Sequence, residues 1–401
     1  MIEIKPNIQH ESNCPYCQMS LSPKEMIWQG IHICMKAECL RCEKVVIEDL
    51  KIGHATNSAY QIDLKAGTVF FNGDKSKLFF KWLGQPLVHS LKNPQDKEIK
   101  ISKEVFKKCQ RVVILNCIDY LYGHSLLKLL NAQRHLENYP NDDLVVIIPT
   151  FLRWMVPKGV AEIWTVDIPL KKSQYFYTSF NQFVCKELER FDEVYVSKAY
   201  SHPSQFDITE FTGISKHNFE QQNFRITFIW REDRLWSYHF LFRFFRKFRI
   251  LEILMLLQNW KIRRLFKRMQ TQLPSAKFTI TGLGQKTNFP EWIEDFRVYK
   301  FDKNTEIEMC KVYSNSRLVI GIHGSNMLLP SAHAGMTIDI MPENRWGNFA
   351  QDILYHEKDP RLAAFKYRYL PFNTSINQLE KIASSMLLKY SEFISNMFED
   401  R

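Results

Sequence analysis

Short strand-like segments recur along the middle and the end of the chain, and segments with helical spacing separate several of them. The predicted buried strands lie at residues 111–115, 144–148, 193–196, 225–230, 277–281, 318–322 and 337–341. The predicted helices lie at residues 123–138, 174–189, 304–314, 327–334 and 375–398. This alternation predicts an α/β fold built on parallel sheets.

The N-terminal part of the chain has a different pattern. Strand-like segments at residues 44–48, 60–64 and 68–71 are separated by turn residues, which predicts a β-hairpin. The polar segment 84–100 contains two prolines and predicts a boundary after this hairpin. The polar stretch 200–223 has few periodic apolar residues, and it predicts a linker between two larger domains.

The length of 401 residues also argues for two or three domains, and the 45% apolar composition supplies enough core for them. The patterns divide the chain into a small cysteine-rich module at 1–45, a β-hairpin connector at 46–100, an N-terminal α/β domain at 101–222, a C-terminal α/β domain at 223–372 and a terminal helix at 373–401.

Two Cys-x-x-Cys pairs, Cys14 with Cys17 and Cys39 with Cys42, are separated by 21 residues. Four thiolates in this pattern predict a closed tetrahedral zinc site of structural type, in a zinc-ribbon module that serves as a scaffold or docks a partner. Cys34 could replace one of the ligands. The competing interpretation is a group of buried or redox-paired thiols.

A glycine-bracketed turn follows the predicted strand 318–322. Gly321 and Gly324 flank His323, so the backbone can bend sharply and approach a ligand closely. Ser325 or Asn326 is a natural N-cap for the helix that follows, and the free N–H groups at such a helix start attract anions.

The same turn leads to the next predicted strand and to Pro342 and Glu343, at the carboxyl end where open α/β sheets bind ligands. This series resembles the C-terminal signature of the family 61 glycosyltransferases. The residues that carry the resemblance are Gly321, His323, Gly324, Ser325, Asn326, Leu328, Leu329, Pro330, Met341, Pro342 and Glu343. Relatives more often carry Ala-Gly or Ala-Ala at positions 325 and 326, so the identity of the donor stays open.

The resemblance implies two facing Rossmann-like domains of GT-B type, with an active cleft between them and a terminal helix that crosses back to the first domain. It implies that a nucleoside-diphosphate sugar contacts His323, Gly324, Ser325 and Asn326, and that Glu343 binds sugar or ribose hydroxyls. Arg231 and Arg234 follow the first strand of the C-terminal domain, where relatives place an arginine pair on the donor diphosphate. Guanidinium groups suit that task because they offset the charge of the departing diphosphate.

Two further sites extend this hypothesis. Gly282 lies in a glycine-containing turn after the strand 277–281, where the donor base or ribose could approach the backbone. The loop after the strand 111–115 resembles the acceptor-facing element of the family, and either Asp119 or His124 could take the acceptor proton. Relatives carry an acidic residue where this chain has Lys128. For Asp119 and His124 taken singly, a capping Asp and a partly buried His are competing interpretations.

The chain lacks a convincing Asp-x-Asp metal motif, because Asp142 and Asp143 precede a strand and therefore lie at the wrong end for a ligand site. Together with the resemblance, this predicts an inverting transfer that uses no catalytic metal. The predicted acceptor is a glycan or a lipid-linked glycan of surface polysaccharide synthesis. A catalytically inactive relative is one alternative.

The net charge of +11 is unevenly distributed. Residues 237–270 hold nine Lys or Arg against one acid and interleave them with eight aromatic residues. This segment predicts either a helical hairpin with an apolar core side or a basic amphipathic surface that meets anionic lipid. A zinc-ribbon nucleic-acid-binding protein is the competing class, although we expect no nucleic-acid partner. Residues 1–11 lack an apolar signal region, and no window is apolar enough to span a membrane, so we expect a cytoplasmic protein, peripheral at the inner face of the membrane.

Overall fold

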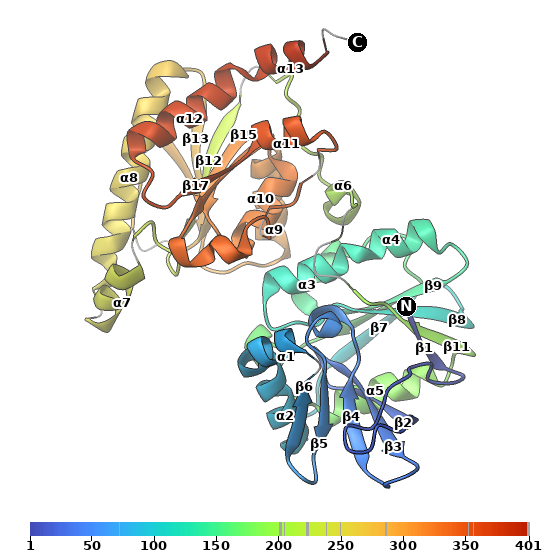
Figure 1. Ribbon diagram of the computed structural model, residues 1–401. Coiled ribbons are helices and arrows are strands. Elements are labelled where there is room, and N and C mark those ends of the chain that lie inside the picture. The colour runs from blue at the N-terminus through green and yellow to red at the C-terminus, as the bar shows by residue number, and fades with distance from the viewer. Residues whose placement is uncertain are drawn as a thin grey trace. The chain divides into compact units, whose positions relative to one another are not determined.

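The computed structural model describes residues 1–401 except 72, 200–202, 204, 222–223, 238, 249, 285–286, 352, 356 and 399–401. The chain divides into two compact units, Met1–Phe211 and Thr212–Arg401 (Figure 1). The predicted boundary between residues 222 and 223 lies outside the described residues. Both units contain strands and helices, so the predicted α/β class is confirmed.

The first unit contains two sheets. Its strands are β1 (Ile2–Lys5), β2 (Leu21–Trp28), β3 (Ile33–Cys39), β4 (Val45–Asp49), β5 (Tyr60–Asp63), β6 (Thr68–Phe71), β7 (Ile101–Val105), β8 (Arg111–Asn116), β9 (Asp143–Pro149), β10 (Glu162–Val166) and β11 (Glu193–Val196). Its helices are α1 (Asp74–Phe79), α2 (Gln85–Lys92), α3 (Tyr122–Leu129), α4 (Asn131–Asn138), α5 (Thr178–Leu188) and α6 (Ile208–Thr212), the last of which ends at the boundary between the units. Shorter helical turns are η1 (Gly53–Thr56), η2 (Phe80–Gly84), η3 (Thr150–Met155) and η4 (Leu170–Lys172).

The larger sheet of the first unit has the strand order β1-β11-β8-β9-β10-β7. The four central strands run parallel, whereas β1 and β7 pair antiparallel at the edges. After β8 the chain adds β9 and β10 on one side of it and then returns to add β11 on the other side. The order of the sheet therefore reverses at β8, and a reversal of this kind opens a crevice at the carboxyl ends of the strands.

The smaller sheet is antiparallel, with the order β2-β3-β4-β5-β6. It crosses the predicted boundary at residues 45 and 46, because β4 pairs with both β3 and β5. Apolar residues of β2, β3 and β4 also share one core with β8, β9, β11 and α5. The cysteine-rich module and the hairpin connector thus form a single sheet that is built into the first unit.

The second unit contains one sheet of six parallel strands, in the order β14-β13-β12-β15-β16-β17. Its strands are β12 (Arg225–Arg231), β13 (Lys277–Leu283), β14 (Ile293–Val298), β15 (Ser316–Ile322), β16 (Met336–Met341) and β17 (Tyr367–Pro371). Its helices are α7 (His239–Lys247), α8 (Leu251–Gln272), α9 (Lys303–Ser314), α10 (Leu328–His333), α11 (Pro360–Lys366), α12 (Ile376–Leu388) and α13 (Tyr390–Phe398), with helical turns η5 (Ser325–Met327) and η6 (Glu343–Asn348).

The strand order of the second unit is third, second, first, fourth, fifth and sixth along the chain, so it reverses between β12 and β15. Alternate residues of these strands point into one apolar core with α8 and α12, while α9 and α10 contact each other and β15 (Figure 1). Buried residues of α12 belong to this core. The return of the terminal helix to the first domain stays a prediction.

Several local predictions were wrong for identifiable reasons. The segment predicted as a polar boundary at 84–100 contains α2, whose apolar side packs with Tyr60 and Ile62 of the small sheet. The strands β10 and β14 were missed because each carries charged residues, including the buried Glu162, which pairs with Arg190.

Candidate functional site

The carboxyl ends of β12 and β15 bring together four of the predicted donor-binding residues in the second unit. Arg231 is the last residue of β12, and its Nη1 donates a hydrogen bond to Oδ1 of Asn326 at 3.2 Å. Arg234 Nη1 donates to the backbone carbonyl of His323 at 2.6 Å. Two guanidinium groups therefore lie at the turn after β15, at the point where the strand order reverses.

Gly324 makes this approach sterically feasible. Its φ of +155° is unfavourable for other residues, and a Cβ atom there would lie 1.8 Å from Nη1 of Arg234. The predicted side-chain cap at Ser325 or Asn326 is wrong, since Gly324 occupies the N-cap of the 3₁₀ turn Ser325–Met327 and no side chain caps it. Among the described residues, the buried Nδ2 of Asn326 has no hydrogen-bond partner.

The histidine of the turn is oriented by a buried carboxylate. His323 Nδ1 lies 2.7 Å from Oδ2 of Asp339 in β16, and both side chains are almost fully buried, at 1% and 0% exposure. A charge-assisted bond of this type fixes the ring and holds the turn against the neighbouring strand. The structure therefore presents the carbonyl of His323 to Arg234 and keeps the imidazole in the interior.

The other predicted donor-binding residues are arranged less tightly. Ser325 is half-buried, and Glu343 is exposed at the start of η6. Gly282 lies within β13 beside Trp230, and a Cβ atom there would come within 1.9 Å of the Trp230 carbonyl. Packing between neighbouring strands is thus sufficient to require glycine at position 282.

Asp233 competes for the same arginine. Nε of Arg231 donates to Oδ1 of Asp233 at 2.6 Å, and a second bond joins Nη2 to Oδ2. Arg231 therefore forms an ion pair with Asp233 alongside its contact with Asn326. An anion at this edge has to share Arg231 with Asp233 or displace it.

The first unit has a second cluster of polar residues at the carboxyl end of β8. Asp119 is fully buried, and the side chains of two histidines and a lysine surround its carboxylate, together with the backbone amide of Leu121, which donates to Oδ1 at 3.2 Å. Oδ2 lies 2.9 Å from Nε2 of His54 and 3.0 Å from Nζ of Lys128, while Oδ1 lies 3.3 Å from Nδ1 of His124. Lys128 also donates to the carbonyl of Ile118 at 2.8 Å.

These neighbouring groups determine the protonation state of Asp119. Burial alone would raise the pKa of Asp119, but Lys128 and the two histidines outweigh that effect and hold the pKa well below its usual range. Burial lowers the pKa of His54, although Asp119 opposes the shift. Asp119 is therefore a carboxylate, and a carboxylate held so strongly is a poor proton acceptor.

His124 has the more favourable geometry for proton transfer. Its side chain is 28% exposed, and its Nδ1 faces Asp119, which leaves Nε2 as the nitrogen that can accept a proton. The rings of Trp82 and Tyr120 lie beside the two histidines, with Tyr120 and His124 centroids 6.3 Å apart.

His54, Asp119 and His124 also place three ligand atoms within 4.8 Å of one another, which is close enough for a metal ion. The donor set fits a cation poorly, because the ammonium group of Lys128 already contacts Asp119 Oδ2 and would repel a second positive charge. The cluster is better suited to an oriented histidine than to a metal.

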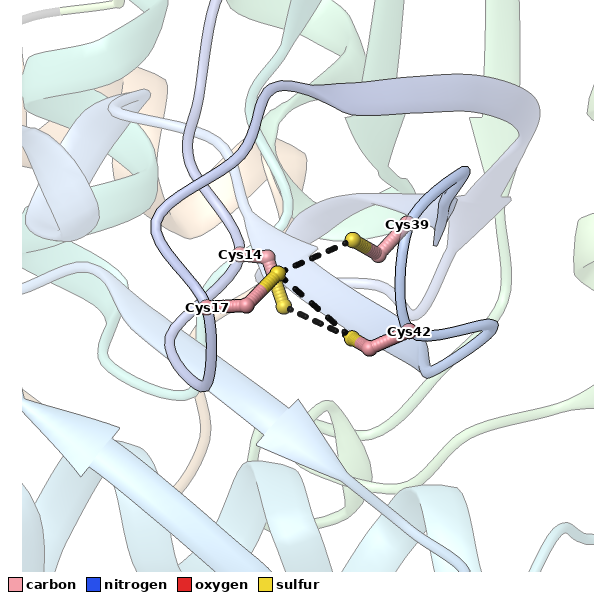
Figure 2. Close-up of side chains that lie close together, drawn as sticks. All are labelled: Cys14, Cys17, Cys39 and Cys42. Carbon is pink, nitrogen blue, oxygen red and sulfur yellow. Dashed lines mark hydrogen bonds between the residues drawn. The ribbon is translucent and has the colours of Figure 1, made fainter.

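The four predicted zinc ligands converge in the first unit (Figure 2). The Sγ atoms of Cys14 and Cys42 lie 3.6 Å apart, and Cys17 Sγ lies 3.4 Å from Cys39 and 3.7 Å from Cys42. These separations are near the ~3.8 Å expected between thiolates at ~2.3 Å from a tetrahedral zinc ion. The cluster is therefore compatible with structural zinc.

Each cysteine pair lies in its own backbone turn, and the two turns are of the same kind. The amide of Gln18 donates to the carbonyl of Cys14, and the amide of Glu43 donates to that of Cys39. Gln18 and Glu43 both have a positive φ, of 63° and 56°. Cys34 is not part of the cluster, since it is fully buried in a separate apolar core with Ile47 and Tyr60, and burial raises its pKa well above the usual range.

Comparisons with known proteins find likeness to solved structures. No family model and no curated protein matches the chain. Among solved structures, the E. coli ADP-heptose lps heptosyltransferase II is similar over 70% of this chain and 99% of its own, with 10% sequence identity and a TM-score of 0.40.

Two residues of these clusters were not found from the sequence. His54 lies in η1, 65 positions before Asp119, and no local motif marks it. Asp339 is the acidic residue of the buried strand β16, and a carboxylate in such a strand requires a partner. That requirement was the available signal for Asp339.

Proposed function

We propose that the chain is a glycosyltransferase that uses a nucleoside-diphosphate sugar. The convergence of Arg231 and Arg234 on the turn at His323 and Asn326 carries this proposal, because it places two guanidinium groups at the reversal point of a doubly wound parallel sheet. Such edges bind nucleotides, and paired guanidinium groups match the oxygen atoms of a diphosphate. The order of the six strands supports a Rossmann-like second domain.

The second unit would bind the donor. Arg231 and Arg234 would contact its diphosphate, with Arg231 exchanging Asp233 for phosphate oxygens. The amide of Asn326 and the backbone of Gly324 and Ser325 would contact the same region. Glu343 would bind sugar or ribose hydroxyls, and Gly282 would lie near the donor base or ribose.

The first unit would supply the proton acceptor. His124 would take the proton of the acceptor hydroxyl as that oxygen attacks the anomeric carbon, which gives inversion in a single displacement. Asp119 would orient the ring of His124 and stabilise the imidazolium ion that forms. The charge that grows on the departing diphosphate would be offset by the two arginines, and this role requires no divalent metal.

The four-cysteine cluster would hold a structural zinc ion. Cys14, Cys17, Cys39 and Cys42 would all be thiolates in it, with no position open for substrate. The acceptor would be a glycan or lipid-linked glycan of surface polysaccharide synthesis.

Donor binding is tested by calorimetric titration with UDP-, GDP-, CMP- and dTDP-sugars, with and without EDTA. One nucleotide class should bind in both conditions. Arg231→Gln should weaken binding at least tenfold, since a charge-assisted contact is lost, whereas Asp233→Asn should bind the donor as tightly as the natural chain or more tightly. Arg225→Gln is the matched control, because Arg225 begins the same strand and pairs with Glu294. Equal affinity in the Arg225 and Arg231 variants would contradict the assigned site.

Proton transfer is tested with His124→Gln in a transfer assay that uses the donor identified above. The rate should fall by about 10²–10⁴ while donor affinity stays the same. His89→Gln is the control, since His89 is an exposed histidine of α2. A full rate in the His124 variant would exclude it as the base.

A non-catalytic nucleotide-sugar-binding protein is the second candidate. It is favoured by Lys128, which ion-pairs with Asp119 and stands where relatives of the resembling family carry an acid. Donor binding that depends on Arg231, together with no turnover on any acceptor, would support this candidate.

A further inference from the structure

The helices α7 and α8 carry a row of exposed apolar side chains. Ile253, Leu256, Leu257 and Trp260 follow one another at intervals that bring them to one side of α8, and each is 45–56% exposed. The opposite side of α8 is buried in the core of the second unit through Leu254, Met255, Ile262, Leu265, Phe266 and Met269. The exposed row is therefore not needed for packing within this unit.

The shorter helix also carries exposed apolar side chains. Phe240 and Phe244 of α7, and Phe248 just after it, are 54–67% exposed, and the rings of Phe244 and Phe248 lie 4.7 Å apart. Phe242 and Phe245 face the other way and pack against the core. Figure 1 shows α7 beside one end of α8, and the two helices contact each other.

Positive charge surrounds this apolar surface. The exposed side of α8 continues past Trp260 into the basic residues Arg263, Arg264 and Lys267. Arg243, Arg246 and Lys247 are exposed on α7. Glu252 is the one acidic residue among positions 237–270.

We propose that α7 and α8 bind the surface of a bilayer that contains anionic lipids. Exposed Phe, Leu and Trp side chains on one side of a helix, bordered by Lys and Arg, have the composition of helices that lie in the membrane interface. The apolar row would enter the boundary between headgroups and acyl chains, and the six cations would contact lipid phosphates. Among the described residues, no helix is long and apolar enough to cross a bilayer.

The chemistry of the row favours lipid over two other partners. Nucleic acid would use the cations and could stack on the aromatic rings, but Ile253, Leu256 and Leu257 offer no flat π-face to a base. A second copy of the chain would bring two segments of net charge +8 together, which opposes association. A lipid surface accepts both the aliphatic side chains and the cations.

The test is co-flotation of the full chain with two kinds of vesicle, at physiological salt and without substrate. One kind is phosphatidylcholine alone and the other is phosphatidylcholine with phosphatidylglycerol. The chain should bind the second kind only. Arg263→Gln with Arg264→Gln should reduce partitioning about 25-fold, because each basic residue contributes about fivefold. Leu256→Ser with Leu257→Ser should reduce it at least tenfold through lost apolar burial.

The matched control is Leu388→Ser with Lys311→Gln. These side chains are 57% and 55% exposed on α12 and α9 of the same unit, and their substitution should leave partitioning unchanged. Thermal melts of all variants should coincide, because the substituted side chains are exposed. If the leucine pair alone changed the melt, the arginine pair would still give an independent result.

Three outcomes would overturn the proposal. The first is that the natural chain does not bind the anionic vesicles. Tight binding to single-stranded RNA or DNA that the same variants abolish, with no vesicle binding, would assign the surface to nucleic acid. A dimer in light scattering that the leucine pair dissociates, again with no vesicle binding, would make it an interface between copies. Because no donor or acceptor enters the experiment, its result is independent of whether the chain transfers a sugar.

Discussion

Both units place a histidine that follows a parallel strand beside an aspartate, yet the two pairs are built differently. In the first unit the carboxylate follows β8, and the side chain of His124 remains 28% exposed. In the second unit the carboxylate lies within β16, and His323 is 1% exposed. The same two residue types thus give an accessible imidazole in one unit and an internal support for a turn in the other.

The partners of the two carboxylates explain this difference. Asp119 is contacted by His54 and Lys128 as well as by His124, so its negative charge is balanced even when His124 is neutral. In the second unit the positive charge lies outside the pair, on Arg231 and Arg234 at the turn. The first arrangement is the one proposed for proton transfer, and the second is the one proposed for anion binding.

The largest difference between the units should be their dependence on zinc. A four-thiolate site in zinc-finger peptides contributes about 10–16 kcal/mol of binding free energy. Cys14 and Cys39 belong to the core shared by both sheets of the first unit. A strong chelator, or Cys39→Ser, should lower the melting transition of the first unit and leave that of the second unchanged, as measured by calorimetry and hydrogen exchange.

Cys109→Ser is the control for this prediction, because Cys109 is a half-buried thiol of the same unit and is not among the four clustered cysteines. If the melting transition of the first unit did not change after removal of zinc, the first unit would depend on side-chain packing alone, as the second unit does.

The next largest effect should follow removal of Asp119. Asp119→Ala leaves the ammonium group of Lys128 buried without its counter-charge, which should destabilise the first unit by about 3–5 kcal/mol. Asp119→Ala combined with Lys128→Met should recover part of this loss, since the buried charge is then gone. Urea unfolding of the first unit measures the stability of the single variant and of the double variant. A single variant as stable as the natural chain would mean that Lys128 finds another counter-charge.

Asp339→Asn should have a smaller effect in the second unit. The amide keeps the shape of the carboxylate but loses the charge-assisted bond to His323, which is worth about 1.5–3 kcal/mol. Because this bond holds the turn that faces Arg234, donor affinity should fall together with stability. Titration and urea unfolding of the same variant give the two values. Loss of affinity at unchanged stability would place Asp339 in direct contact with the donor.

A site residue could be predicted from sequence where it directly follows a predicted strand, and not where a distant segment brings it to the site. Arg231, Arg234, His323 and Asn326 follow two apolar runs, and adjacent parallel strands end at the same edge, so their approach could be predicted. His54 could not be placed, because it reaches Asp119 from a 3₁₀ turn between β4 and β5 of the smaller sheet, far from Asp119 in the sequence. The role of the His323 ring was also not predictable, since its orientation depends on Asp339 in the neighbouring strand.

The same reasoning applies to the fold. Strands such as β11 and β12 are apolar and continuous, and the structure confirms their predicted positions. β10 was missed because Glu162 and Thr165 interrupt its apolar pattern. Both are buried in the sheet, where Glu162 is neutralised by Arg190, a residue far along the chain. A long-range ion pair of this kind allows a charged residue inside a buried strand, and the strand then lacks the apolar pattern on which its prediction depends.

The two units should respond alike to acid, which gives the smallest difference between them. Burial lowers the pKa of His135 in the first unit and of His217 in the second, each to about 4. The unfolded chain has a histidine pKa near 6.5 and therefore binds more protons between these values, so stability falls as the pH decreases from about 6.5 to about 4. At pH 5 each histidine should cost about 1–2 kcal/mol relative to pH 7.

Unfolding of each unit at pH 7 and pH 5 tests this expectation. His135→Gln should reduce the acid sensitivity of the first unit only, and the second unit is the internal control. If the substitution changed nothing, other groups of the first unit would be responsible for its response to acid.

The pairing of β1 with β11 determines when the larger sheet of the first unit can be completed during synthesis. Ile2 lies opposite Val196 at the edge of the larger sheet, and Nζ of Lys5 donates to the carbonyls of Leu188, Glu189 and Phe191. At ribosomal rates of about 5–20 residues per second, β1 waits about 10–40 s until β11 has been synthesised. During that interval the edge of β1 that later pairs with β11 has no partner, so the larger sheet, whose strand β8 leads to Asp119, is complete only after residue 196 has been made.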